Sequence, residues 1–176
     1  VPYVHYEKFE EVFGAFLADV DVDGKLDLIT VHSSSAIIRL GLGSGTFQDP
    51  PFAKVVFAEP LRAMPRMLDA TGDGRPDMFV TTKNSFGLLV GVPGGFEPFK
   101  RIGDRIGPAL TAADMNVDGF DDVVEGADNI SSSSDHVSIR LGAANGGLTV
   151  AQTYSLPARA RGAVAADFNS DGVIDL

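Results

Sequence analysis

The sequence predicts an all-β chain, a β-propeller of four-stranded antiparallel blades, with three full blades and partial blades at both ends. Three observations predict it. An Asp-rich loop of nine residues occurs four times, apolar runs flank these loops, and a glycine turn closes a third apolar run in each full unit. Short strands separated by glycine-, proline- and asparagine-containing turns at such a spacing are typical of all-β folds.

The Asp loops set the period. They occupy residues 19–27, 69–77, 114–122 and 167–175 and share the form D-x-[D/N/T]-x-D-G-x-x-D, so their starts are 50, 45 and 53 residues apart. A repeat of about 50 residues matches one propeller blade. We call these segments the first to fourth Asp loops.

Each element of the unit has its own signal. The run before each loop is rich in small residues, as expected for an innermost strand; these runs are residues 13–18, 63–68, 109–113 and 163–166. The second strands are predicted at residues 28–31, 78–81 and 123–124, with Leu176 beginning a fourth. The third strands end in glycine turns near residues 41–45, 91–95 and 142–147. The fourth strands are predicted at residues 53–57, 96–102 and 148–154.

The predicted domain organisation is a single partial propeller over residues 1–176. It comprises a strand of an incomplete blade at 1–11, blades at 12–58, 59–105 and 106–157, and the start of a further blade at 158–176. Closed propellers commonly have four to eight blades. We therefore expect this chain to form part of a larger ring of about seven blades. The remaining blades would come from the same longer chain or from another copy.

The Asp loops suit calcium. Ca²⁺ takes six to eight oxygen ligands at about 2.3–2.6 Å. In a tight loop the side chains at positions 1, 3 and 5 converge on one point, and glycine at position 6 permits the turn. The backbone carbonyl at position 7 and the carboxylate at position 9 can add two further oxygen ligands. The predicted ligands are Asp19, Asp21, Asp23, Lys25 and Asp27; Asp69, Thr71, Asp73, Arg75 and Asp77; Asp114, Asn116, Asp118, Phe120 and Asp122; and Asp167, Asn169, Asp171, Val173 and Asp175.

Up to four Ca²⁺ ions are therefore expected, one in each loop. The first loop has four carboxylates, whereas position 3 of the others is Thr71, Asn116 or Asn169, so the first site should bind most tightly. The alternative is a set of Asx turns without metal. Four copies in register favour calcium, because clustered carboxylates repel one another unless a cation neutralises them.

An EF-hand is the competing calcium motif. The third loop fits its spacing, with Glu125 at the twelfth position, but Thr30 and Val80 stand at the equivalent positions of the first two loops. Neither residue can supply the bidentate carboxylate that an EF-hand needs. The flanking segments are also strand-like, so the EF-hand is rejected.

The loops and their flanks resemble the FG-GAP and VCBS-type repeats of calcium-binding propellers, such as those of integrin α-subunits. Residues 13–15 (Phe-Gly-Ala), 107–109 (Gly-Pro-Ala) and 162–163 (Gly-Ala) resemble the small-residue part of that signature, whereas the second unit has Met64 and Pro65 there. The resemblance implies structural calcium on one face of the propeller, away from the usual ligand surface.

Composition excludes several other functions. The net charge is -10, and most Asp residues occupy the loops, so much of this acidity belongs to the predicted metal sites. No basic stripe or aromatic platform is present, so nucleic-acid binding is not expected. No apolar stretch is long enough for a membrane span. No catalytic constellation stands out either, so enzymatic activity is not expected, although the sequence leaves it open.

The expected function is that of an extracellular recognition or adhesion module, lectin-like, for a protein or glycan. Alternatives are a scaffold propeller of a larger secreted carbohydrate-active enzyme, or a structural assembly subunit. An extracellular, cell-surface or periplasmic location is expected because all-Asp loops of this kind fill at millimolar calcium.

The connections from the fourth strand of one unit to the first strand of the next are basic. They hold seven of the 14 Lys and Arg residues, namely Arg62, Arg66, Lys100, Arg101, Arg105, Arg159 and Arg161. These residues form either an anion or acidic-glycan surface opposite the calcium loops or ordinary solvated charge, and the sequence favours the second interpretation.

Overall fold

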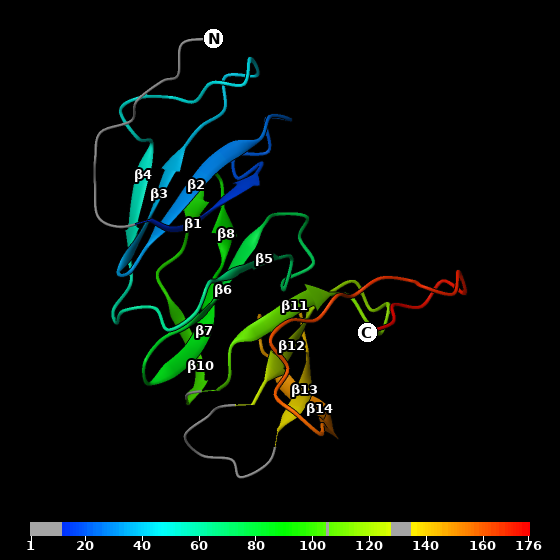
Figure 1. Ribbon diagram of the computed structural model, residues 1–176. Helices are drawn as coiled ribbons and strands as arrows, with labels where there is room; N and C mark the ends of the chain where they lie inside the picture. Colours follow the sequence, from blue (N-terminus) through cyan, green and yellow to red (C-terminus); the bar gives the residue numbers. More distant parts are fainter. Residues whose placement is uncertain (1–11, 105, 128–134) are drawn as a thin grey trace.

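The computed structural model describes residues 12–104, 106–127 and 135–176 (Figure 1). Within these residues, the regular structure is entirely β: three four-stranded antiparallel sheets and one two-stranded hairpin. This confirms the predicted all-β class and the four-stranded blades. The strand expected at residues 1–11 lies outside the described residues.

Each sheet is one blade. The first blade contains β1 (Val12–Ala18), β2 (Asp27–His32), β3 (Ser35–Arg39) and β4 (Ala53–Val56). The second contains β5 (Arg66–Leu68), β6 (Asp77–Thr81), β7 (Ser85–Leu89) and β10 (Lys100–Asp104), with a hairpin of β8 (Gly91–Val92) and β9 (Gly95–Phe96) between β7 and β10. The third contains β11 (Ala109–Ala113), β12 (Asp122–Gly126), β13 (His136–Leu141) and β14 (Thr149–Ser155).

The strands of each blade pair in chain order, so every strand is antiparallel to its neighbour in the sequence. Two predicted first strands are shorter than expected. In the second blade β5 begins only at Arg66, directly after Pro65, because proline has no N–H to donate to a ladder. In the fourth unit the described pairing is one bridge, Ala166 with Asp175, instead of a strand over residues 163–166.

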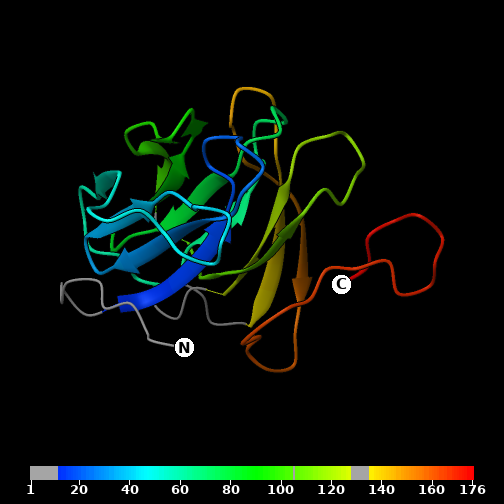
Figure 2. The same ribbon diagram turned by 90° about the horizontal axis from the view of Figure 1, so that it is seen from above.

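The three blades stand side by side in chain order (Figures 1 and 2). The side chains of β6 alternate between two cores. Met78 and Val80 pack against the first blade, whereas Phe79 packs against the third. Because both faces of β6 are buried, its three central residues, Met78 to Val80, are all apolar.

The first strands of the second and third blades, β5 and β11, lie next to each other (Figure 1). Small side chains such as Ala109 and Ala112 on β11 allow this close approach. The guanidinium of Arg66 joins the two strands, because its Nε and one terminal nitrogen donate to the Leu110 carbonyl at 3.3 and 3.1 Å. This arrangement is the one expected of strands that face a propeller axis.

No helix long and apolar enough to cross a membrane occurs among the residues that the structure describes.

Candidate metal centres

The Asp loops connect the first two strands of each blade. The first loop joins β1 to β2, the second joins β5 to β6, and the third joins β11 to β12, so all three lie at the same end of their blades. The fourth loop is closed by the bridge between Ala166 and Asp175, with N–H to carbonyl distances of 3.2 and 2.8 Å. The structure thus gives each predicted site the same place in its unit.

The backbone of the four loops has one shared conformation. The glycine at position 6 has a φ of 79° to 89° in every loop, as the turn requires. Position 4 is left-handed as well, with φ values of 61° at Val22, 68° at Gly72, 59° at Val117 and 62° at Ser170. Valine rarely adopts this conformation, so these positions carry backbone strain. Sequence reasoning missed position 4, because a glycine marks it in only one of the four loops.

The carboxylate at position 1 organises the turn. In the first loop Asp19 accepts the N–H of Asp23 through Oδ1 at 3.0 Å and that of Gly24 through Oδ2 at 2.8 Å. The corresponding pairs of hydrogen bonds, all 2.8 to 3.1 Å long, are accepted by Asp69, Asp114 and Asp167. These bonds to backbone N–H groups hold the pKa of Asp167 below its ordinary value. In all four loops, the two hydrogen bonds of position 1 hold the turn in place.

The carboxylate at position 9 connects three strands, a role that the sequence analysis did not foresee. Asp27 is buried, and it accepts the N–H of Val20 at 2.8 Å and that of Gly41 at 2.7 Å. Val20 follows β1, and Gly41 lies just beyond β3. The carboxylate thus ties the ends of the first and third strands to the start of the second.

The same bridge recurs in the next two blades. Asp77 accepts from Gly91 at 2.7 Å, and Asp122 accepts from Gly142 at 2.9 Å and from Met115 at 2.9 Å. Burial raises the pKa of both carboxyls, and their hydrogen bonds to backbone N–H groups only partly oppose that effect. The glycine that ends each third strand could have indicated this bridge, because its backbone N–H lies within hydrogen-bonding reach of the loop.

Position 5 is the most exposed acidic position. Asp23 accepts the Lys25 N–H at 2.9 Å and pairs with the Lys25 ammonium, which holds the pKa of Asp23 below its ordinary value. In the second loop the Arg75 side chain lies 3.9 Å from Asp73. In these two loops the side chain at position 7 therefore provides a cation for the carboxylate at position 5.

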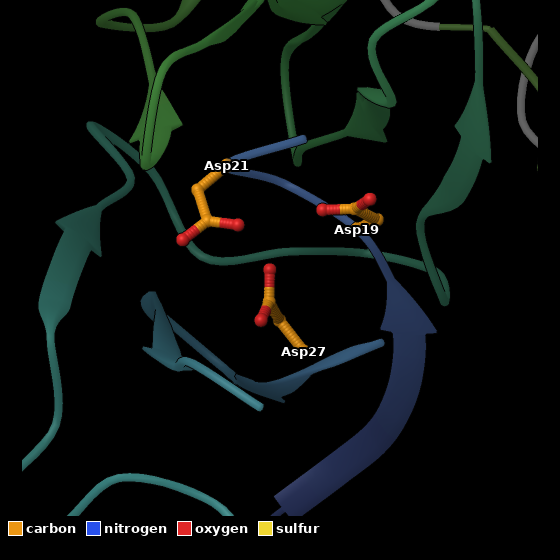
Figure 3. Close-up of side chains that lie close together, drawn as sticks. All are labelled: Asp19, Asp21 and Asp27. Carbon is orange, nitrogen blue, oxygen red and sulfur yellow. The ribbon is translucent and has the colours of Figure 1, made fainter. Parts of the chain in front are cut away.

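The first loop brings three carboxylates together. One oxygen from each of Asp19, Asp21 and Asp27 lies within 4.8 Å of the others, and Figure 3 shows the three side chains pointing toward one another. Loss of solvent, followed by the negative charges of Asp23 and Asp27, raises the pKa of Asp21. Oxygens bound to one Ca²⁺ at about 2.4 Å cannot lie more than about 4.8 Å apart, so the three Asp side chains fit a shared ion.

The other loops have no third acid at position 3, and the polar residues there bond within the loop. Thr71 donates to Asp77 through N–H and Oγ1 at 3.1 and 3.3 Å. Asn116 and Asn169 accept the N–H of the residue at position 5 at 3.3 and 2.9 Å. Their side-chain oxygens face the same turn as the acids and could join a metal's ligands.

The second and third loops contact each other directly. Asp121 accepts the Asp69 N–H through Oδ2 at 2.7 Å, and its own N–H donates to the Asp69 carbonyl at 2.9 Å. The Phe120 ring also packs against Gly72, where a β-carbon would lie only 2.8 Å from the ring. Glycine at position 4 of the second loop is thus required by the neighbouring blade as well as by φ.

Comparison with known proteins supports the resemblance found in the sequence. Residues 19–80 match the family model of the FG-GAP-like repeat, a range that contains the first two Asp loops. No curated protein matches the chain.

Among solved structures, the Tc holotoxin pore of Photorhabdus luminescens has a similar fold, with a TM-score of 0.61 and 18% sequence identity. The alignment covers 91% of this chain and 8% of the toxin chain. At this identity the likeness concerns the fold alone. This chain therefore spans a small part of the length of the protein that it matches.

Proposed function

We propose that this chain is a calcium-stabilised β-propeller module that recognises a protein or glycan outside the cytosol. The observation that carries the proposal is the convergence of Asp19, Asp21 and Asp27 within 4.8 Å, in a loop whose sequence and backbone conformation recur three more times. The FG-GAP-like match over residues 19–80 supports it.

The first Asp loop would hold its ion through the side chains of Asp19, Asp21 and Asp27, with Asp23 and the Lys25 carbonyl completing the set. To bind the ion, Asp23 would have to give up its ion pair with the Lys25 ammonium. The other three loops would use the corresponding residues, with Thr71, Asn116 or Asn169 at position 3. When bound, Ca²⁺ would supply positive charge to mutually repelling carboxylates.

A structural role for the metal follows from the contacts of its ligands. Position 1 holds the turn and position 9 joins three strands, so an ion that links the two would fasten the loop to the blade. The free energy of metal binding then adds to the free energy of unfolding. A site filled at a hundred times its Kd adds about 2.7 kcal/mol.

The extracellular location is part of the proposal. Sites of this ligand type fill at millimolar calcium, which is found outside cells rather than in resting cytosol. The proposed recognition of a protein or glycan is based on the propeller architecture, because loops at the ends of strands commonly carry binding residues.

A second candidate function is that of a structural assembly subunit. It is supported by the fold similarity to one segment of a Tc toxin chain and by exposed apolar side chains on β1, the first strand of the first blade, and on β14, the last strand of the third, such as Leu17 and Tyr154. Blades that pack against further blades or other chains would cover such side chains.

Thermal unfolding together with calorimetric titration tests the metal. We expect Ca²⁺ at about 5 mM to raise the Tm by several degrees relative to EDTA, with binding at up to four sites. Asp21→Asn should weaken or remove one site, whereas Asp49→Asn, which replaces an exposed Asp outside the loops, should change neither quantity. Equal Tm values with and without calcium, and no binding heat, would refute the proposal.

A further inference from the structure

A hollow of about 320 Å³ lies where the second blade, the third blade and the segment after β14 meet. Three arginines line it, and the remaining walls are apolar or small; the lining is Ala63, Met64, Arg66, Pro108, Ala109, Leu110, Arg159, Ala160 and Arg161. None of these residues is acidic, although the chain carries a net charge of -10. The hollow is therefore a positively charged site in an acidic protein.

Hydrogen bonds to backbone carbonyls hold the Arg66 side chain in the lining of the hollow. Its Nε and one terminal nitrogen donate to the Leu110 carbonyl, and its other terminal nitrogen donates to the Pro65 carbonyl at 3.1 Å. A guanidinium has five N–H donors, so these three bonds leave two donors for a ligand. Burial lowers the pKa of Arg66, and the carbonyls that hold it bring no compensating negative charge. The group remains a cation nonetheless.

Arg159 and Arg161 are the other two cations that line the hollow. They lie in the segment that follows β14 and passes beside β11 (Figure 1), on either side of Ala160. Both are exposed, and neither makes an ion pair with a residue that the structure describes. Three guanidinium groups around one hollow repel one another, and a bound anion would relieve that repulsion.

The residues that line the hollow indicate the chemical class of its ligand. Arginine binds carboxylate and phosphate groups through paired N–H donors. The volume is at the small end of the range for ligand pockets, and the apolar wall of Met64, Pro108 and Leu110 suits the carbon skeleton of a small molecule.

We propose that the hollow between Arg66, Arg159 and Arg161 binds a compact oxyanion, a carboxylate or a phosphate carried by a ligand of about monosaccharide size. The inference rests on the recognition role proposed above and names its ligand class. It does not depend on the calcium loops, because none of their residues lines the hollow.

Isothermal titration at low salt with calcium present tests the site, with glucuronate, glucose 6-phosphate and glucose as probes. We expect one equivalent of at least one anionic sugar to bind and neutral glucose not to bind. Glucuronate alone would identify a carboxylate site, and glucose 6-phosphate alone a phosphate site. Because charge drives the contact, affinity should fall as salt is added.

Matched variants locate the binding. The double variant Arg159→Ala/Arg161→Ala removes two exposed cations from the hollow and should weaken anion binding at least tenfold. The double variant Lys54→Ala/Lys83→Ala removes two exposed cations elsewhere and should bind like the wild type. The absence of anion binding, equal binding of glucose, or equal losses in both double variants would overturn the inference.

A calcium-dependent Tm measured on the same samples separates the two proposals. A protein that gains stability from calcium but binds neither anion would refute the oxyanion site and leave the metal sites standing.

Discussion

At the scale of single residues, the Asp loops divide their acids between two tasks. Positions 3 and 5 are partly or fully exposed, whereas Asp27, Asp77 and Asp122 at position 9 are buried and bonded to backbone N–H groups of other strands. A buried carboxylate with such partners stabilises the blade whether or not a metal is bound. Loss of position 9 should therefore be costly even without calcium.

Asp77→Ala tests this role. The substitution leaves the N–H groups of Thr71 and Gly91 without their acceptor, and each unsatisfied buried donor costs about 1–3 kcal/mol. We expect the free energy of unfolding in EDTA to fall by about 2–4 kcal/mol. Urea denaturation measures it, with Asp73→Ala as the matched control, because Asp73 is exposed and its loss should cost less than about 1 kcal/mol. Equal losses in the two variants would refute the bridging role.

The left-handed valines give a second prediction. Val117 has a φ of 59° and is 68% exposed, so it loses little packing if replaced. Asparagine tolerates the left-handed region better, so Val117→Asn should raise the free energy of unfolding by about 1 kcal/mol.

Val150→Asn is the control for that substitution. Val150 is 52% exposed on β14, where valine suits the strand and asparagine does not, so stability there should fall slightly. Thermal unfolding of both variants in EDTA provides the comparison. A destabilised Val117→Asn protein would contradict the strain argument.

The sequence alone could predict the turn at the glycine of position 6, because this turn forms within nine residues. The hydrogen bonds by which position 1 holds the turn were not predicted, since the sequence pattern indicated only a metal ligand there. The bridging role of position 9 could not be predicted in this way. It requires Gly41 to lie beside Asp27, a contact that exists only after the third strand has paired with the second. The metal ligands assigned to the four loops stay predictions.

At the scale of elements, a buried ion pair links the second and third blades. Arg140 on β13 donates to Glu125 on β12 at 3.0 and 2.9 Å, and its guanidinium carbon lies 4.8 Å from the centre of the Phe86 ring on β7. Glu125 is only 5% exposed, and burial raises the pKa of its carboxyl although Arg140 opposes the shift. Its Oε2 has no hydrogen-bond partner among the residues that the structure describes.

The raised pKa of Glu125 determines the direction in which stability changes with pH. A carboxyl that is harder to ionise in the folded state contributes stability below its ordinary pKa of 4.5, and this contribution is lost as pH rises through the folded-state pKa. Relative to Glu125→Gln, the wild type should therefore be more stable at pH 4 than at pH 7. Urea denaturation of both proteins across this range measures the difference. A constant gap between the two profiles would show that Glu125 ionises normally.

The contact between the second and third Asp loops is another link between blades. Asp121→Ala removes the acceptor of the Asp69 N–H, a partly buried hydrogen bond, and should lower the free energy of unfolding by about 1–2 kcal/mol. Asp104→Ala removes an exposed carboxylate from β10 and should cost about 0.5 kcal/mol or less. Thermal melts compare the two variants, and equal Tm values would show that the contact between the loops contributes nothing.

Strand positions could be predicted well where apolar runs meet the Asp loops, as for β2, β6 and β11. The hairpin of β8 and β9 could not be predicted, because the sequence analysis assigned residues 91–95 to the glycine turn that ends the third strand. Contacts between blades set such details. The N–H of Gly94, for example, donates to the Val20 carbonyl of the first blade at 3.2 Å. No sequence pattern within the second unit predicts that hydrogen bond.

At the scale of the whole molecule, the exposure of a strand follows its place in the blade. The central strands β6, β7 and β12 are buried at every position, whereas the outermost strands β10 and β14 are partly or wholly exposed. The period of the sequence could predict the blades. It could not predict how many blades close the ring, because closure depends on contacts between blades that a single unit does not encode. A ring of about seven blades stays a prediction.

Charge acts on the same scale. The net charge is -10, and four Ca²⁺ ions would offset most of it. In the first loop, oxygens of three carboxylates lie within 4.8 Å of one another, and a cation would offset their repulsion. We therefore propose that calcium is part of the folded molecule rather than an occasional ligand.

The central claim is that these loops hold calcium, and anomalous diffraction from crystals grown in calcium tests it most directly. We expect an anomalous peak inside each Asp loop, about 2.3–2.6 Å from oxygens at positions 1, 3, 5, 7 and 9, and strongest in the first loop. Well-ordered loops without an anomalous peak, their carboxylates bonded only to backbone N–H groups and basic side chains, would contradict the account.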